Sequence, residues 1–267
     1  MSWMHIDLTG RTAFVSGSTQ GIGRVIARQL AQAGAAVTVS GRGEERVEET
    51  VRTLREEVPG AVVSGVAADL GTADGAQRAF DALPEVDVLV NNLGIFAPQP
   101  LLEIDDDTWQ RFWDVNVLSA IRLTRHYAPG MRDRGWGRVQ FMASDSAVVI
   151  PEEMVHYGVT KTALLGVSRG FAKTLAGSGV TVNAVIAGPT HTEGVEDFVR
   201  ELVGDDLPWD EAQQEFMREH RPASLIQRLI EPREIANMIV YLCSDQASAT
   251  TGGALRVDGG YVDHILP

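Results

Sequence analysis

Cysteine is almost absent from this sequence, in which Cys243 is the single thiol among 267 residues. One thiol cannot form an intramolecular disulfide, and it excludes a metal site built from several thiolates. The histidines do not supply such a site either, because none has a second ligand at metal-binding spacing. We therefore expect no metal ion.

Basic residues are also scarce, since 23 lysines and arginines stand against 36 aspartates and glutamates, for a net charge of −13. This balance opposes binding to phosphate backbones, and we expect no nucleic-acid partner. No apolar run is long enough to span a membrane, and the first eight residues lack the basic start and apolar run of a signal peptide. We expect a cytoplasmic protein without membrane association.

Short apolar segments alternate with segments of helical periodicity along the whole chain. This alternation predicts an α/β fold, a doubly wound parallel sheet with helices on both faces. The expected strands are 11–16, 36–40, 61–66, 86–90, 138–143, 180–186 and 253–257. The expected helices are 22–30, 44–57, 75–83, 105–127, 155–176 and 232–244. Without repeats or a dividing linker, residues 1–267 are expected to form a single domain.

Residues 191–228 depart from this alternation. They are acidic and helix-prone, with an interruption at Pro208 and Trp209. The segment is too long for a simple connection in a compact domain. We expect a flap of one or two helices over the site.

A glycine-rich turn joins the first expected strand to the first helix. Gly17, Gly21 and Gly23 form the pattern Gly-x-x-x-Gly-x-Gly. Glycine there permits positive φ and lets phosphate groups approach backbone N–H groups at the positive end of a helix. A plain tight turn is the alternative, but the position between strand and helix favours a dinucleotide site.

Tyr157 and Lys161 lie four residues apart in an expected helix, and Ser144 precedes them at the end of a strand. Residues at this spacing share one helix face, so an ammonium group is easily held near the phenol. A nearby cation lowers the pKa of a phenol, which ordinarily titrates near about 10. The pair alone is common on helices, so the other motifs must support a catalytic role.

Together these motifs resemble the short-chain dehydrogenases/reductases in their single-domain, nicotinamide-dinucleotide-binding form. The resemblance extends from about residue 8 to residue 260 and includes Asn91-Asn92-Leu93-Gly94 and Asn116. It differs at the loop after the sixth strand, where Ala187 precedes Gly188 and Pro189 follows it. The resemblance implies an oxidoreductase that transfers hydride between nicotinamide and a carbonyl or alcohol carbon.

The resemblance also implies roles for individual residues. Tyr157 would be the general acid/base, Lys161 would lower its pKa and hold the ribose, and Ser144 would polarise the carbonyl oxygen. Asn116 would hold a water that returns protons to Lys161. The implied cofactor-binding residues are Gly17, Ser18, Thr19, Gln20, Gly21, Ile22, Gly23, Arg42, Asp69, Leu70, Asn92, Gly94, Tyr157, Lys161, Gly188, Pro189, Thr190 and Thr192.

The end of the second expected strand bears on the choice of cofactor. An acidic residue there would bind the adenosine ribose hydroxyls, whereas an arginine can pair with a 2′-phosphate. Gly41 occupies the acidic position and Arg42 follows it. We expect a preference for NADP(H), with NAD(H) possible, although Arg42 could merely solvate the helix entry and Gln20 is not basic.

The expected substrate pocket is mixed and largely apolar, suited to a small or medium carbonyl or alcohol. Its expected residues are Ser146, Ile150, Met154, His191, Phe198 and Trp209. Many members of the family reduce 3-oxoacyl groups on acyl carrier protein, and Arg132, Arg134 and Arg138 are the candidate docking residues for that alternative. The acidity of the flap opposes it.

A non-catalytic dinucleotide sensor is a further alternative. It would keep the glycine-rich turn but would not need Ser144, Tyr157 and Lys161 together, so their retention speaks against it. The family resemblance implies a homotetramer or homodimer.

Overall fold

Seven strands pair in parallel in one sheet, in the order β3-β2-β1-β4-β5-β6-β7. The structure is a computed structural model that describes residues 5–204 and 206–265. The strands are β1 Thr12–Val15, β2 Ala36–Gly41, β3 Val63–Ala67, β4 Val88–Asn91, β5 Gly137–Ser144, β6 Val180–Ala187 and β7 Ala254–Val257. The predicted doubly wound parallel sheet is confirmed.

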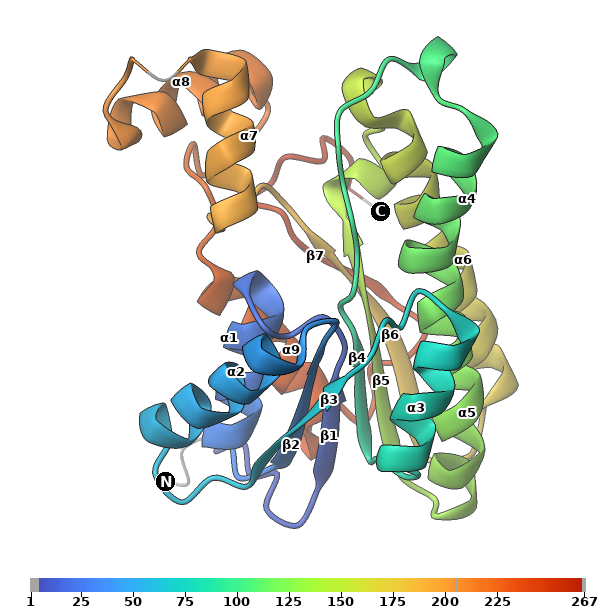
Figure 1. Ribbon diagram of the computed structural model, residues 1–267. Helices are drawn as coiled ribbons and strands as arrows, with labels where there is room; N and C mark the ends of the chain where they lie inside the picture. The colour runs from blue at the N-terminus through green and yellow to red at the C-terminus, as the bar shows by residue number, and fades with distance from the viewer. Residues whose placement is uncertain (1–4, 205, 266–267) are drawn as a thin grey trace.

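Helices cover both faces of the sheet (Figure 1). They are α1 Gly21–Gln32, α2 Glu44–Glu57, α3 Ala73–Ala82, α4 Asp106–Trp113, α5 Ser119–Asp133, α6 Val155–Thr174, α7 Glu193–Val203, α8 Trp209–His220 and α9 Pro232–Cys243. Within residues 5–204 and 206–265, no helix combines the length and apolarity needed to cross a membrane.

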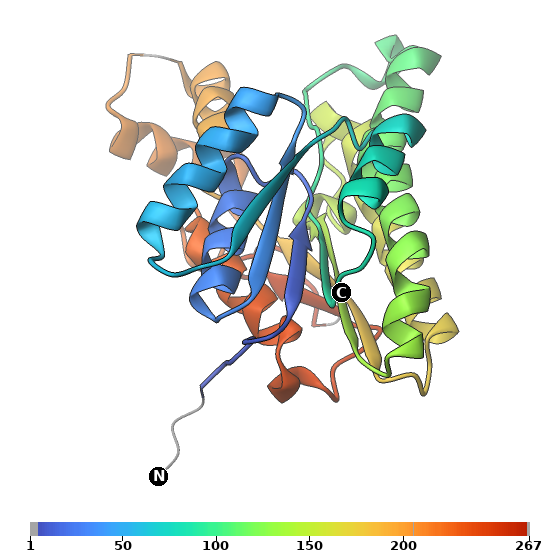
Figure 2. The same cartoon turned by 60° about the horizontal axis from the view of Figure 1, so that its bottom comes forward.

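The two faces of the sheet bury separate apolar cores. Alternate residues of a strand point to opposite faces, so Val15 packs with α1, α2 and α9 while Phe14 packs with α3, α5 and α6. Figure 2 shows α2 and α3 on the two sides of the sheet. Because the strands are buried on both faces, they read in the sequence as continuous apolar runs.

The crossover direction reverses at β1, which pairs with β2 on one side and with β4 on the other. In open α/β sheets, ligands bind beyond the carboxyl ends of the strands at such a switch point. This topology brings the turn after β1 beside the turn after β4.

The prediction of one continuous helix over residues 105–127 is wrong. The structure has α4, a turn of π-helix at Asp114–Leu118, and α5, which continues through Pro129 to Asp133. Proline inside a helix removes one backbone hydrogen bond. Pro129 and Arg125, four residues earlier, both lie on the exposed face of α5. Water can satisfy the Arg125 carbonyl there, so the helix does not end at the proline.

Residues 191–228 contain α7 and α8, which lie above the carboxyl ends of the strands (Figure 1). Asp205, between the two helices, lies outside the described residues. Phe198, Val199, Phe216 and Met217 form a small apolar core between these helices, to which Met154 also belongs. Contacts of this core with Met154 and Tyr157, which lie outside the segment, hold it beside the cavity end of the sheet.

Candidate active site

A cavity of about 950 Å³ opens at the carboxyl ends of the strands. The turns after β1, β2, β3 and β4 line one part of it, and Ser144, Tyr157 and Lys161 line another. Residues of α7 and α8 also line it. One continuous space therefore contains the predicted dinucleotide turn and the predicted catalytic residues.

The glycines of the turn after β1 are required by close contacts. Gly17 and Gly21 have φ of 62° and 54°. A Cβ atom on Gly23 would lie 2.4 Å from Asn92 Nδ2 and 2.5 Å from the Gly17 carbonyl oxygen. Side chains are therefore excluded, and the backbone remains accessible to a ligand.

The start of α1 is suited to an anion. Gln20, the N-cap residue, makes no side-chain capping bond, and the first turn carries no acidic residue. The first N–H groups of a helix have no partner within the helix, and the helix dipole favours negative charge there. Together with the close-packed glycines, this arrangement fits the phosphates of a dinucleotide.

Ser16 and Asn92 connect the turns after β1 and β4. Ser16 Oγ accepts hydrogen bonds from the N–H groups of Asn92 and Leu93, at 2.9 and 3.0 Å. Asn92 Nδ2 donates to the carbonyl oxygens of Ser16 and Gly17, at 3.1 and 2.9 Å. Asn92 thus holds the turn in place, a structural task beside its expected cofactor contact.

Two arginines line the cavity beside the end of β2. Arg42 and Arg46 are exposed, and neither guanidinium group has an ion pair or hydrogen bond within the described part of the chain. A Cβ on Gly41 would lie 2.6 Å from the side-chain methyl group of Thr19, so an acidic side chain there would require the Thr19 side chain to move. Sequence reasoning missed Arg46, although its position four residues after Arg42 was a usable signal.

The rest of the expected cofactor set lies around the same cavity. Its wall includes Gly17, Thr19, Gln20, Gly21, Ile22, Gly23, Arg42, Asp69, Leu70, Asn92, Gly94, Gly188, Pro189, Thr190 and Thr192. Ser18 is the exception. It is buried behind the turn, where its Oγ donates to the Val15 carbonyl and accepts from the Ser40 N–H.

The displaced proline is accommodated by pairing with another segment. Ile230 N–H donates to the Pro189 carbonyl, and His191 N–H donates to the Ile230 carbonyl, each at 2.8 Å. These two bonds form a parallel bridge between Thr190 and Ile230. The loop after β6 is thereby fixed beside the cavity.

Ser144 ends β5, while Tyr157 and Lys161 lie in the first two turns of α6. Lys161 is 5 % exposed, and its Nζ donates to the Met142 carbonyl at 2.8 Å. This bond to β5 fixes Nζ 5.5 Å from the centroid of the Tyr157 ring. The structure therefore brings the three predicted residues together.

The pKa values differ from the expectation. Burial raises the pKa of Tyr157 to about 12, with Ser144 opposing the shift and Asp145 adding to it. Burial also lowers the pKa of Lys161 to about 8. The expected lowering of the phenol pKa by Lys161 is therefore not seen, because the loss of water around the phenol dominates. Tyr157 is protonated at neutral pH and can act as a proton donor.

Asn116 lies in the π-helical turn and is fully buried. Its amide nitrogen donates to the Ile95 carbonyl and to Thr160 Oγ1, both at 3.0 Å, and its oxygen accepts from the Ile95 N–H at 2.8 Å. Asn116 thus ties the turn after β4 to α6. The π-helical turn was not predicted.

Half of the expected substrate pocket lies in the cavity. Ser146, Met154 and Phe198 line it, but Ile150, His191 and Trp209 do not. Ile150 is 40 % exposed and covers Gly158 from outside. His191 and Trp209 stack on each other, with ring centroids 5.2 Å apart. Sequence reasoning missed Phe96, Asp145, Glu193, Val195, Phe216 and Arg221, which do line the cavity.

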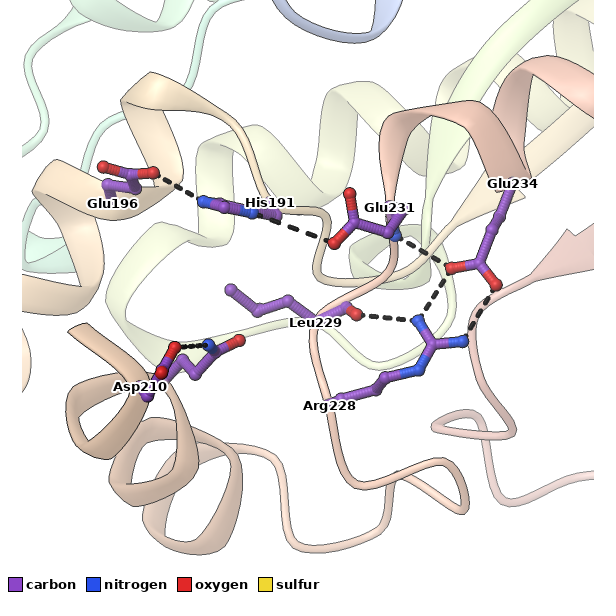
Figure 3. Close-up of polar contacts among 8 residues, drawn as sticks. His191, Glu196, Asp210, Arg228, Leu229, Glu231 and Glu234 are labelled. Atoms are coloured by element: carbon purple, nitrogen blue, oxygen red, sulfur yellow. Dashed lines mark hydrogen bonds and ion pairs between the residues drawn. The ribbon is translucent and has the colours of Figure 1, made fainter.

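His191 instead belongs to a polar group at the base of the flap (Figure 3). Its Nε2 lies 2.5 Å from Glu196 Oε1, and its Nδ1 lies 3.9 Å from Glu231 Oε1. Arg228 Nη1 and Nη2 lie 2.7 and 2.9 Å from the two carboxylate oxygens of Glu234. These contacts connect the flap to the start of α9.

Within the described ranges, no group of three metal-ligating side chains is present.

The Arg228–Glu234 pair gives a prediction on stability. Its hydrogen bonds lower the pKa of Glu234 from 4.5 to about 2, so the stabilisation is complete above pH 4.5 and is lost as the pH falls to about 2. Both side chains are partly exposed, so Glu234→Gln should lower the free energy of unfolding by about 1 kcal/mol at neutral pH. Urea unfolding at several pH values should show this difference shrinking toward acid. The pair of Glu215 with Arg218 is the control, because the Glu215 carboxylate accepts no backbone hydrogen bond from the described residues whereas Glu234 accepts one from the Glu231 N–H. E215Q should change stability by less than about 0.5 kcal/mol.

The fold and the cavity together define the class of protein. The glycine-rich turn lies at the switch point of the parallel sheet, and it lines the same cavity as Ser144, Tyr157 and Lys161. A family model described as Enoyl-(Acyl carrier protein) reductase matches residues 17–262. The uncharacterized oxidoreductase YvaG of Bacillus subtilis is 49 % identical to this chain. The match covers 98 % of this chain and 100 % of the YvaG sequence.

Dehydrogenase/reductase SDR family member 4 of Bos taurus is 35 % identical, covering 97 % of this chain and 89 % of its own. The crystal structure of L-sorbose reductase from Gluconobacter frateurii, complexed with NADPH and L-sorbose, has a TM-score of 0.91 and 33 % identity. The match covers 98 % of this chain and 100 % of the L-sorbose reductase chain. The chain belongs to the short-chain dehydrogenase/reductase family, the NAD(P)-dependent oxidoreductases that act on alcohol and carbonyl groups.

Proposed function

We propose that this protein is an NADP(H)-dependent oxidoreductase of a small or medium carbonyl or alcohol substrate, with Tyr157 as general acid/base. The observation that carries the proposal is the shared cavity. Ser144, Tyr157 and Lys161 line the same space as the glycine-rich turn and Arg42. Turnover of NADPH with a panel of ketones, aldehydes and quinones tests it.

The residues fit the proposed chemistry. The nicotinamide ring supplies or accepts hydride when the cofactor is bound. Tyr157 donates its phenolic proton to the substrate oxygen during reduction and takes it back during oxidation. Lys161, held by the Met142 carbonyl, provides positive charge beside the phenolate that forms. Ser144 has one hydroxyl proton, which it now donates to Asp145 and must turn toward a bound substrate oxygen.

Arg42 and Arg46 support the preference for NADP(H). Guanidinium groups without protein partners are suited to a phosphate. The double variant R42A/R46A should raise the Michaelis constant for NADPH by about tenfold or more, because charge-assisted bonds to the phosphate are lost. The constant for NADH should change by less than about threefold. Arg52, which pairs with Glu49 on the outer face of α2, supplies the control R52A. An NADPH constant that hardly moves in the double variant refutes this assignment.

The relatives support the proposal without naming the substrate. L-sorbose reductase was crystallised with NADPH and L-sorbose. Its similarity supports NADPH as cofactor and a carbonyl compound of modest size as substrate.

The alternative of an acyl-carrier-protein substrate agrees with the description of the family model. The candidate docking residues do not support it. Arg138 is 2 % exposed and pairs with Asp245, and Arg134 pairs with Glu85. Both lie near the start of β5, whereas Ser144 ends it. Three arginines at the opposite edge of the sheet do not form a basic surface beside the cavity.

A dinucleotide sensor would bind NADPH and turn over no carbonyl compound, so the same panel separates the two functions.

For assembly, we propose a homotetramer or homodimer through the long helices that begin near Asp105 and Val155, and through the last strand. Trp113, at the end of α4, and Val159, in α6, are 38 % and 40 % exposed apolar residues. Light scattering tests the oligomeric state.

A further inference from the structure

Asp145 is a buried carboxyl group in the cavity that the proposed function does not use. It follows Ser144 directly, is 6 % exposed, and lines the cavity. Its Oδ1 accepts hydrogen bonds from Ser144 Oγ and Ser146 N, both at 2.8 Å, and from Ser146 Oγ at 3.4 Å. Its Oδ2 accepts no hydrogen bond from any described residue.

The surroundings of Asp145 do not neutralise this second oxygen. Arg221 acts on Asp145 through its charge, but the two form no ion pair within 4.0 Å, and Arg221 Nη2 lies 3.7 Å from Glu153 instead. Asp258 is a further acidic group close enough to act on Asp145. Oδ2 is not one of the fully buried polar atoms that lack a partner, so it is open to the cavity. An acceptor that is open to the cavity and has no partner among the described residues is suited to a hydrogen bond from a ligand.

The position of Asp145 limits where that ligand group can be. Under the proposed function, on which this inference rests, Ser144 binds the reacting oxygen of the substrate. Asp145 Oδ1 lies 2.8 Å from Ser144 Oγ, so the carboxyl group stands beside the place of the reacting oxygen. We propose that Oδ2 reaches the carbon next to the reacting carbon and binds a hydroxyl group there, and that the substrates are α-hydroxy ketones or aldehydes and the corresponding vicinal diols.

A hydroxyl group fits this place better than a carboxylate or an alkyl group. It both donates and accepts, so it pairs with Oδ2 whether or not the carboxyl group is protonated. A substrate carboxylate cannot donate a hydrogen bond to Oδ2, and it would be repelled by Asp145 when the carboxyl group of Asp145 is ionised. An alkyl group would leave Oδ2 without a partner. The apolar side chains of Phe96 and Phe198 remain for the carbon skeleton.

Binding of the substrate need not undo the turn that holds Asp145. When Ser144 turns its single proton to the reacting oxygen, the N–H and Oγ of Ser146 still donate to Asp145 Oδ1. Asp145 therefore keeps its orientation while Oδ2 binds the second substrate oxygen.

The test compares two substrates that differ by one group. Hydroxyacetone and butanone have nearly the same size, with a hydroxyl group in the first where the second has a methyl group. The ratio of their kcat/KM values with NADPH should fall by at least about tenfold in Asp145→Ala, mainly through loss of hydroxyacetone reduction. Comparing ratios removes the different intrinsic reactivity of the two ketones.

Two further variants complete the experiment. Asp145→Leu fills the space without a polar atom and should give the same lowered ratio if the alanine variant does not fold. Glu153→Gln removes a carboxylate that pairs with Arg221 but does not line the cavity, and it should keep the wild-type ratio. NADPH binding and thermal unfolding of each variant show whether the protein is intact.

Equal losses on both ketones in the Asp145 variants would mean that Asp145 only positions Ser144, and would overturn the inference. Equal kcat/KM of the wild-type protein for both ketones would overturn it without any variant. A wild-type protein that binds NADPH but reduces no carbonyl compound of the panel would instead refute the proposed function itself.

Discussion

Replacing Tyr157 with phenylalanine should lower kcat for carbonyl reduction by about a thousandfold or more. The variant keeps the aromatic ring, which contacts the flap core and Phe96, and removes the phenolic hydroxyl group that is proposed to exchange a proton with the substrate oxygen. NADPH affinity should change by less than about threefold, because the glycine-rich turn and the arginines are untouched. Steady-state kinetics and NADPH fluorescence titration measure the two quantities.

A matched control is available in Tyr241 on α9, which does not line the cavity. Tyr241→Phe also removes one phenolic hydroxyl group and should leave kcat within about twofold of the wild-type value. Near-normal turnover by Tyr157→Phe would remove Tyr157 from the mechanism.

Replacing Gly23 with alanine should have the second large effect. The new Cβ would lie 2.4 Å from Asn92 Nδ2 and 2.5 Å from the Gly17 carbonyl oxygen, so the turns after β1 and β4 must separate. We expect NADPH binding to weaken by about a hundredfold or more, and the free energy of unfolding to fall by about 1 to 3 kcal/mol. Isothermal titration calorimetry and urea unfolding measure these changes.

Gly170, an exposed residue of α6 that does not line the cavity, provides the control for this substitution. A Cβ there would have no atom within 4 Å. Gly170→Ala should therefore bind NADPH with unchanged affinity and be at least as stable as the wild type, because alanine is the better helix former. A Gly23→Ala variant that binds NADPH normally would show that the two turns are not held as closely as the structure indicates.

Most of the fold was predictable because its pattern is local. Buried parallel strands are short apolar runs, and the helices between them have a periodic apolar face. The exception was the segment from Asp106 to Asp133, where the helix boundaries depend on exposure at Pro129 and on the buried bonds of Asn116. Neither feature is visible in a local pattern.

The predicted catalytic set was also accessible from the sequence, because its spacing along one helix and after one strand is local. Lys161 is one of only two lysines in the chain, so its position four residues after Tyr157 is less expected by chance. The net direction of the Tyr157 pKa was predicted wrongly, because burial of the phenol raises its pKa and burial is a tertiary property.

The flap side of the cavity was least predictable. The sequence indicates helices in residues 191–228 but not which helix faces turn inward. His191 and Trp209 were expected in the cavity, yet they stack on each other, while Phe216 and Arg221 line it. This choice depends on packing between α7, α8 and Met154, residues far apart in sequence.

The central claim is that this cavity transfers hydride from a nicotinamide to a carbonyl carbon. The direct measurement uses NADPH with deuterium at the transferable position of the nicotinamide ring, together with hydroxyacetone, and analyses the product by mass spectrometry. We expect one deuterium on the carbinol carbon of the product from the wild-type protein, and about a thousandfold slower formation of this labelled product with Tyr157→Phe. A product formed without deuterium at that carbon, or labelled product formed at the same rate by both proteins, would contradict this claim.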